Sequence, residues 1–210
     1  PVAKPLVFSL TLLPFLWLLY GAAADLLGPN PAEHLIRSTG QWALRGLCLT
    51  LAVTPLRVLL GQPALARFRR MAGLFVFFYA VLHVLCYAWF DMGFEWLEIV
   101  RDIARRPFIL VGFAAFVLLL PLAATSNHYA IARLGGRRWQ ELHRAIYPAA
   151  LLACLHFLGM RELAELPLPL SYSVFLGILL WWRIQERRRK AQPPAQSVTK
   201  PVHFYRQERK

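Results

Sequence analysis

Charge, and acidic charge above all, is scarce in this chain. Only 17% of its 210 residues are charged, and these comprise 11 acids against 24 basic residues. The hydrophobic residues make up 58% of the sequence and occur in blocks too long for a water-soluble domain. This composition excludes a sizeable soluble domain and predicts a protein that crosses a membrane several times.

Cysteine is equally scarce. The chain has three cysteines, Cys48, Cys86 and Cys154, and each falls inside an apolar block rather than in a connecting loop. A disulfide framework is therefore not expected, and the three thiols are interpreted as packed and free.

Several catalytic signatures are missing. The sequence contains no nucleotide-binding glycine fingerprint, no thiol metal cluster and no hydrolase triad. The chain is therefore not expected to oxidise a pyridine nucleotide by itself. The net charge of +13 could suggest nucleic acid, but the basic residues cluster beside the ends of apolar blocks, so membrane topology explains them and no nucleic acid is expected.

What is present is a series of six apolar segments, each long enough to cross about 30 Å of hydrocarbon as a helix. We expect an all-α integral membrane protein, a six-helix transmembrane bundle within residues 1–184, followed by a basic, disordered tail at 185–210. A short surface helix is expected within 91–106, a basic loop at 126–139, and an interruption of the fifth span at Pro148. The expected spans are residues 6–24, 41–60, 71–90, 107–124, 139–160 and 168–184.

The distribution of charge predicts the orientation of the bundle. Most of the 24 basic residues fall on the side that holds both termini, and most of the 11 acids fall on the other side. Because cytoplasmic loops carry the excess of Lys and Arg, both termini are expected to be cytoplasmic.

Three histidines, His83, His143 and His156, lie inside these apolar spans. A neutral histidine in a helix bundle can simply form a hydrogen bond with a neighbour. Imidazole is also a strong ligand for heme iron, and two imidazoles from facing helices can hold a porphyrin between them. All three are therefore candidate metal ligands.

Depth in the membrane indicates which histidines could share one iron. Counted from the basic residues at the span ends, His83, His156 and His143 lie at depths of about 20, 27 and 8 Å. The first two differ by about 7 Å, whereas His83 and His143 differ by about 12 Å. We therefore predict that His83 and His156 form the ligand pair.

A second pair of histidines is not available. A partner for His143 should lie 13 or 14 residues before His83, where the sequence has Arg70 and Arg69. His143 could ligate alone, bind a second cofactor or only form hydrogen bonds.

Arginines near the span ends are candidate anion ligands. Arg45 could meet a heme propionate or extend to the membrane interface. Arg69 and Arg70 could contact anionic lipid or the phosphate of a flavin, or could simply anchor the topology.

Four stretches carry a resemblance to a known family: TGQWALRGLCLTLAVTPLR, RRMAGLFVFFYAVLHVLCY, RRPFILVGFAAFVLLLPLAATS and LGGRRWQELHRAIYPAALLACLH. They are similar to the MsrQ (formerly YedZ) family, which is related to the ferric-reductase-like transmembrane domains. The resemblance extends over residues 6–183 and places the family's membrane histidines at His83, His143 and His156. Related ferric reductases carry a second histidine on the third helix, where this chain has the arginine pair.

The resemblance implies a bacterial inner-membrane protein that carries heme b and also associates with FMN. Such a subunit takes electrons from the quinone pool or from a cytosolic flavin reductase. It passes them to MsrP, a periplasmic molybdopterin-containing methionine-sulfoxide reductase that repairs oxidised periplasmic proteins. The expected role is thus an electron-transfer subunit rather than a complete enzyme.

Two other functions are compatible with the sequence. A stand-alone ferric reductase or a respiratory cytochrome subunit would use the same heme with another acceptor. A transporter or proton-relay protein would use the histidines to carry protons.

Overall fold

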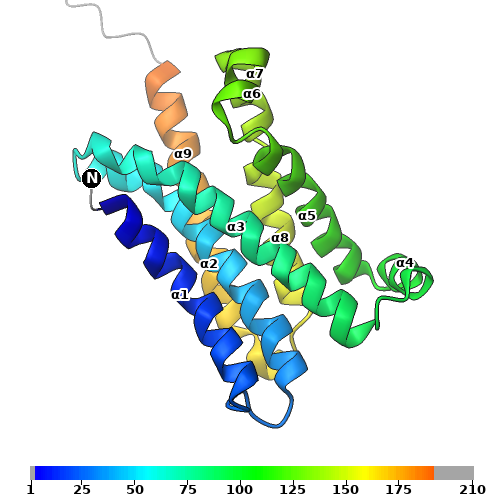
Figure 1. Cartoon of the computed structure of the whole chain (residues 1–210). Helices are drawn as coiled ribbons and strands as arrows, with labels where there is room; N and C mark the ends of the chain where they lie inside the picture. Colours follow the sequence, from blue (N-terminus) through cyan, green and yellow to red (C-terminus); the bar gives the residue numbers. More distant parts are fainter. Residues whose placement is uncertain (1–2, 192–210) are drawn as a thin grey trace, which may run out of the picture.

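The computed structural model describes residues 3–191, except for the side chains of residues 190 and 191. Within this range the chain is helical and has no strand, and six helical segments are long and apolar enough to cross a membrane (Figure 1). The predicted all-α, six-helix membrane fold is confirmed.

The six spans use most of the helices. α1 and α2 are single helices, α3 continues into a π-helical turn, α5 is single, α7 and α8 form one broken span, and α9 is the last. The short helices α4 and α6 connect spans. The bounds are α1 Ala3–Ala23, α2 Pro31–Leu59, α3 Ala66–Cys86 with its π-helical turn Tyr87–Asp91, α4 Trp96–Arg105, α5 Pro107–Ala124, α6 His128–Leu134, α7 Gly136–His143, α8 Ile146–Gly159 and α9 Pro167–Ala191.

The bundle has two chemically different ends. The end at which α2, α5 and α9 begin is called the histidine end, and it is the lower one in Figure 1. The opposite end, at which α3 and α7 begin, is called the arginine end. α1 begins and α9 ends at the arginine end, so the two ends of the described chain lie on the same side of the bundle. That this side is cytoplasmic remains a prediction.

The second span begins earlier than the apolar pattern indicates. The sequence predicts its start near residue 41, but α2 begins at Pro31. The side chain of Asn30 accepts a hydrogen bond from the Glu33 backbone N–H at 3.1 Å, and proline suits the first turn because its missing N–H is not needed there. Hydropathy detects only the apolar part of a helix, so this polar extension was missed.

The fifth span is interrupted, but one turn before the predicted position. α7 ends at His143 and α8 begins at Ile146. Pro148 lacks an N–H, and its ring would clash with the carbonyl of Arg144, four residues earlier. The prediction identified the right residue as the cause and misplaced the break, because proline disturbs the turn that precedes it.

Two further connections differ from expectation. The predicted basic loop at 126–139 contains α6, whose first turn is capped by Asn127: its side chain accepts from the Ala130 N–H at 2.7 Å. α9 continues to Ala191, seven residues beyond the predicted span. The rest of the predicted tail, residues 192–210, lies outside the described residues. The predicted surface helix within 91–106 is α4.

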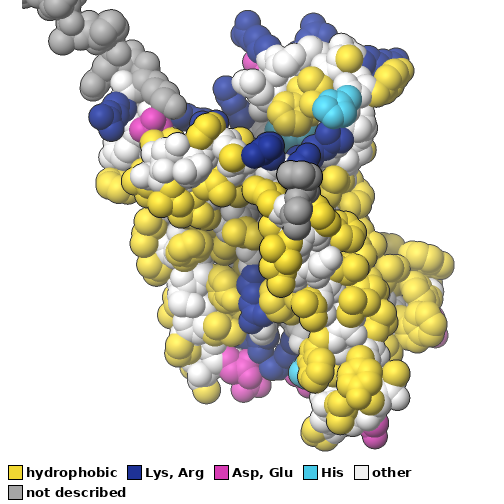
Figure 2. All heavy atoms as spheres, turned by 60° about the vertical axis from the view of Figure 1, so that its left-hand side comes forward, with side chains coloured by type: hydrophobic (Ala, Val, Ile, Leu, Met, Phe, Trp, Pro, Cys, Tyr) yellow, Lys and Arg dark blue, Asp and Glu magenta, His cyan; other side chains and the backbone are white. Residues whose placement is uncertain are grey.

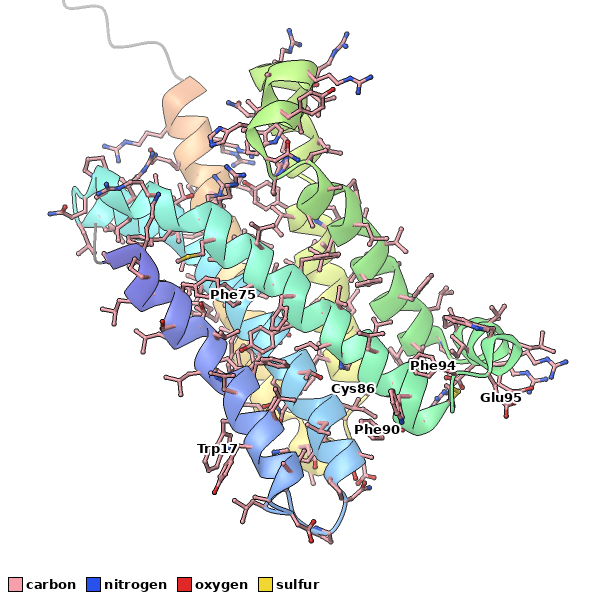
Figure 3. All side chains as sticks on the ribbon, viewed as in Figure 1. Trp17, Phe75, Cys86, Phe90, Phe94 and Glu95 are labelled. Carbon is pink, nitrogen blue, oxygen red and sulfur yellow. The ribbon has the colours of Figure 1, made fainter. Side chains whose placement is uncertain are left out.

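The core lies mainly between α2, α3, α8 and α9. Leu51, Val76, Ala150 and Leu176 are each at most 2% exposed at its centre. Hydrophobic side chains also cover the outer flanks (Figure 2). Trp17, for example, points away from the bundle on the outer side of α1 (Figure 3). Such a surface is suited to lipid.

Candidate functional site

Two of the three membrane histidines lie side by side at the histidine end. His83 of α3 and His156 of α8 have ring centres 6.0 Å apart, with ring planes 70° apart. A metal bonded to both imidazoles at about 2 Å would hold the ring centres roughly 6 Å apart. The spacing therefore fits one metal ion between the two rings.

Each of these rings is held by a backbone carbonyl of a neighbouring helix. The His83 Nδ1 lies 2.9 Å from the Ile36 carbonyl, and the His156 Nδ1 lies 2.7 Å from the Phe108 carbonyl. A carbonyl can only accept, so Nδ1 donates in both cases, and in the neutral imidazole Nε2 then keeps its lone pair. A ring nitrogen that donates to a carbonyl is the usual support of a metal-bound histidine.

Two glycines allow the rings to approach the helices so closely. A Cβ at Gly40 would lie 3.0 Å from the His83 Nδ1, and one at Gly112 would lie 2.6 Å from the His156 Nδ1. Distances this short require the ring or the helix to move. Any larger residue at either position would therefore displace a histidine, most severely at Gly112.

The two histidines use the same local arrangement. On α2 the acceptor carbonyl of Ile36 precedes Gly40 by four residues, and on α5 the carbonyl of Phe108 precedes Gly112 by four residues. Four residues are about one helical turn, so carbonyl and glycine lie on one face of each helix. Each imidazole crosses a glycine and reaches the carbonyl one turn away. The sequence pattern pointed to the histidine ligands but not to Gly40 and Gly112, the glycines that leave space for their rings.

A cavity of about 460 Å³ lies against both histidines. This volume is within the range of cofactor pockets, which is roughly 300–1,000 Å³. Apolar side chains from α2, α3, α5 and α8 form most of its wall, and Ile99 and Ile103 contribute from α4. The site is thus an apolar chamber with two nitrogen ligands.

The charged residues of this cavity are concentrated at the histidine end. Arg37, Arg106 and Arg161 line it together with Glu33 and Asp91. Each arginine also pairs with an acid, as Arg37 with Glu33 at 2.6 Å, Arg106 with Asp102 at 2.6 Å and Arg161 with Glu165 at 2.5 Å. Arg37 also pairs with Glu165 at 3.2 Å. Because a guanidinium has five N–H donors, each of the three arginines can still bind a further anion.

One of these pairs fastens α4 to the bundle. Asp102 accepts from Arg106 Nε at 2.7 Å and Nη2 at 2.6 Å, and from the Tyr87 hydroxyl at 2.6 Å. The Arg106 guanidinium holds the pKa of Asp102 below its ordinary value, and the Tyr87 hydroxyl acts in the same direction. The carboxylate therefore stays charged throughout the neutral range.

Arg45, predicted as a partner of a propionate, lies outside the cavity wall. Its Nε donates to the Tyr172 hydroxyl at 3.0 Å, its Nη2 donates to Gln41 at 3.4 Å, and its guanidinium lies 4.5 Å from the Trp42 ring centre. Its partner Gln41 lines the cavity, and Arg45 itself does not. Tyr172, its partner on α9, was not singled out from the sequence.

His143 lies at the arginine end, away from the other two histidines. Its Nδ1 is 3.0 Å from the Trp139 carbonyl, its Nε2 is 3.4 Å from Ser126 Oγ, and its ring stacks on Trp139 at 3.8 Å. Both ring nitrogens are thus engaged. The structure does not bring His143 together with His83 and His156.

Arg69 and Arg70 also lie at the arginine end. Arg70 Nη1 is 3.3 Å from the His128 Nε2. Arg69 is close enough to His143 and to Arg183 for their charges to interact. At the depth where a partner for His143 would be expected on α3, the structure therefore has charged arginines.

The residues at the histidine end fit a porphyrin better than a metal ion held by protein alone. Within residues 3–191, no three His, Cys, Asp or Glu side chains gather into a metal-binding group. Two imidazoles supply two ligands only, and the apolar chamber beside them has room for a flat organic ring that supplies the others. His83 and His156 are the residues that would hold its iron.

Comparison with known proteins agrees with this arrangement. Residues 39–154 match the family described as ferric reductase like transmembrane component. A protein of Polaromonas naphthalenivorans named protein-methionine-sulfoxide reductase heme-binding subunit MsrQ is 56% identical, over 91% of this chain and 88% of the relative. The chain belongs to the MsrQ family.

Other MsrQ proteins cover the chain equally well. The MsrQ of Bordetella pertussis is 51% identical over 90% of this chain and 92% of its own length. The MsrQ of Azospira oryzae is 47% identical over 98% of this chain and 90% of its own length. No solved structure matches the chain.

Proposed function

We propose that this protein is the heme-binding electron-transfer subunit of a methionine-sulfoxide reductase system. The observation that carries the proposal is the His83–His156 pair, with both Nδ1 atoms donating to carbonyls and both rings facing a cavity of about 460 Å³. The names of the MsrQ relatives support the same function. Bound heme b supplies an iron that accepts and releases one electron at a time.

The protein's own residues have distinct tasks in this proposal. The carbonyls of Ile36 and Phe108 fix which nitrogen of each imidazole faces the iron. The apolar wall excludes water and so raises the influence of nearby charge on the redox potential. Arg37, Arg106 and Arg161 bind the carboxylates of the porphyrin edge, a role the sequence had suggested for Arg45.

The electron donor and acceptor are proposed from the family resemblance. The donor is the quinone pool or a cytosolic flavin reductase, and the acceptor is MsrP, a periplasmic molybdopterin-containing partner. FMN is proposed as an additional cofactor, with Arg69 and Arg70 as candidate partners of its phosphate. Six apolar spans fit a multi-pass protein, and the proposed location is the bacterial inner membrane.

His143 belongs to the arginine end and is not needed by the heme pair. Both of its ring nitrogens already have partners. We therefore assign it a hydrogen-bonding role between α7 and the end of α5, rather than a place in a second heme site.

Reoxidation of the reduced protein tests the proposal. Purified protein loaded with heme is reduced anaerobically in lipid nanodiscs and mixed with the molybdopterin partner and methionine sulfoxide. The reduced heme absorbance is expected to disappear only when partner and sulfoxide are both present. A matched sample receives ferric citrate instead.

The result separates the alternatives. Reoxidation by ferric citrate, with no response to the partner and sulfoxide, would favour a ferric reductase and overturn the proposed acceptor. A protein that takes up no heme when heme is plentiful would overturn the cytochrome function and favour a histidine-dependent transporter.

A further inference from the structure

The arginine end contains a buried cation that the bundle does not neutralise. Arg183 of α9 is only 7% exposed. Its Nη1 donates to the Tyr147 hydroxyl at 2.9 Å. Its Nη2 donates to the Leu51 carbonyl at 2.7 Å and to Thr54 Oγ1 at 3.1 Å. All three acceptors are neutral, so the guanidinium is hydrogen-bonded while its charge remains uncompensated.

One donor of this guanidinium has no partner. The Nε of Arg183 is buried and forms no hydrogen bond with any residue in the described part of the chain. Buried donors are nearly always satisfied, because leaving one unpaired costs free energy. The geometry therefore leaves one N–H of a buried cation available.

Three more arginines lie near Arg183 or its neighbours. Arg69 of α3 lies within electrostatic range of Arg183, and Arg57 of α2 lies within electrostatic range of Arg69. Arg187 donates from Nη2 to the Tyr147 hydroxyl at 3.2 Å. The guanidiniums of Arg183 and Arg187 lie 5.5 and 5.3 Å from the centre of the Tyr147 ring. Positive charge from α3 and α9 thus converges around the Tyr147 phenol.

Within residues 3–191, no salt bridge joins this cluster to an acid. The salt bridges found there include none of Arg57, Arg69, Arg183 or Arg187. Figure 2 shows Lys and Arg side chains gathered over the upper end of the molecule, which is the arginine end. Like charges repel, and charged residues inside membrane spans normally meet a counter-charge. The cluster is therefore suited to an anion from outside the bundle.

We propose that Arg69, Arg183 and Arg187, together with Tyr147, form a binding site for a phosphate group. A phosphate offers several acceptor oxygens to planar guanidiniums, which bind it in bidentate fashion. The Tyr147 hydroxyl accepts from both Arg183 and Arg187, which leaves its proton for the ligand. The position at a membrane face suits the headgroup of an anionic phospholipid, and a soluble phosphate has the same chemistry.

Thermal unfolding of the heme-loaded protein in detergent tests this site. Three additions are compared at equal ionic strength: phosphatidylglycerol in mixed micelles, inorganic phosphate, and chloride. At least one phosphate source is expected to raise the unfolding midpoint by about 4 °C over chloride. A rise with the lipid alone assigns the site to a headgroup, and a rise with inorganic phosphate assigns it to a soluble phosphate.

The variants change the exposed arginines of the site and not Arg183, because Arg183 holds α9 against α2 and its loss could unfold the bundle. The double variant Arg69→Gln with Arg187→Gln is expected to lose the rise and to keep its heme absorbance, since the histidines lie at the other end. Arg133→Gln is the matched control, an exposed arginine of α6 at the same end of the bundle, and it is expected to keep the rise.

Two outcomes would overturn the proposal. One is the absence of any rise in the unchanged protein with either phosphate source. The other is an equal loss of the rise in Arg133→Gln and in the double variant, which would indicate diffuse attraction to the whole basic face.

Discussion

The two ends of the bundle differ in how their arginines are paired. At the histidine end each cavity-lining arginine has an acidic partner, and each ligand ring donates from Nδ1 to a backbone carbonyl. At the arginine end Arg183 has neutral partners only, and further arginines lie near it. The first end has its arginine charges already paired within the protein and suits a large, mostly apolar cofactor. The second is incomplete and suits an anion.

The largest expected effect comes from removing a ligand ring. His83→Ala and His156→Ala are each expected to abolish the Soret absorbance of the purified protein, because a single remaining imidazole cannot hold the iron between helices. His143→Ala is the control at the opposite end and is expected to keep the band. A full Soret band in either ligand variant would contradict the assigned pair.

The second largest effect on heme binding is expected from adding one methyl group beside His156. In Gly112→Ala the new Cβ would meet the His156 Nδ1 at 2.6 Å. Overpacking of this kind costs about 2 kcal/mol, which lowers heme affinity roughly 30-fold. Gly177→Ala in α9, where a Cβ meets nothing within 4 Å, is the matched control. Heme titration followed by absorbance measures both, and equal affinities would show that the close approach is not needed.

The arginines at the edge of the cavity should contribute less to heme affinity than the two histidine rings. Arg161→Gln removes a guanidinium that lines the cavity and pairs with Glu165. Loss of one charged hydrogen bond to a heme carboxylate is expected to weaken heme binding roughly tenfold. Arg137→Gln, which breaks an exposed arginine–glutamate pair with Glu141 at the arginine end, should leave affinity unchanged. If both variants lose affinity equally, general charge rather than contact is responsible.

The smallest effect concerns the attachment of α4. The pKa of Asp102 is held below its ordinary value of 3.8. The stabilisation from its pair with Arg106 is therefore fully present above about pH 4 and is lost as the pH falls through the lower pKa of the folded state. Hydrogen exchange of α4 amides is expected to be steady, once corrected for intrinsic rates, from pH 8 to 5 and to increase below pH 4. Asp102→Asn should exchange faster than the parent protein from pH 8 to 5 and approach it below the lowered pKa of Asp102, and a profile equal to that of the parent protein throughout would exclude this role.

Apolar runs and charge counts were sufficient to predict the six spans. Pro107–Ala124 agrees at both ends because its boundaries are a first-turn proline and the end of an apolar run. Such signals could not locate the start of α2 or α6, where capping asparagines begin polar helices. The break before α8 depends on how a proline disturbs the preceding turn, which periodicity does not register.

Depth alone was sufficient to select His83 and His156 as neighbours, since residues of adjacent spans at one level can meet. It could not show that Gly40 and Gly112 admit the rings, because a glycine inside an apolar run has several explanations. A sequence signal does exist: a glycine within a span, at the same depth as a histidine of the next span. The environment of Arg183 could not be predicted, because only the fold shows that its hydrogen-bond acceptors are Tyr147, Leu51 and Thr54.

The repeated carbonyl and glycine arrangement has a mechanical consequence. One helix pair, α2 with α3, holds His83 by its own contacts, and a second pair, α5 with α8, holds His156 by its own contacts. Each ring is therefore fixed to its own pair, and the gap between the rings is set by how the two pairs dock. A group bound by both imidazoles would act as a clasp between two half-bundles, so its removal should loosen their docking before either pair comes apart.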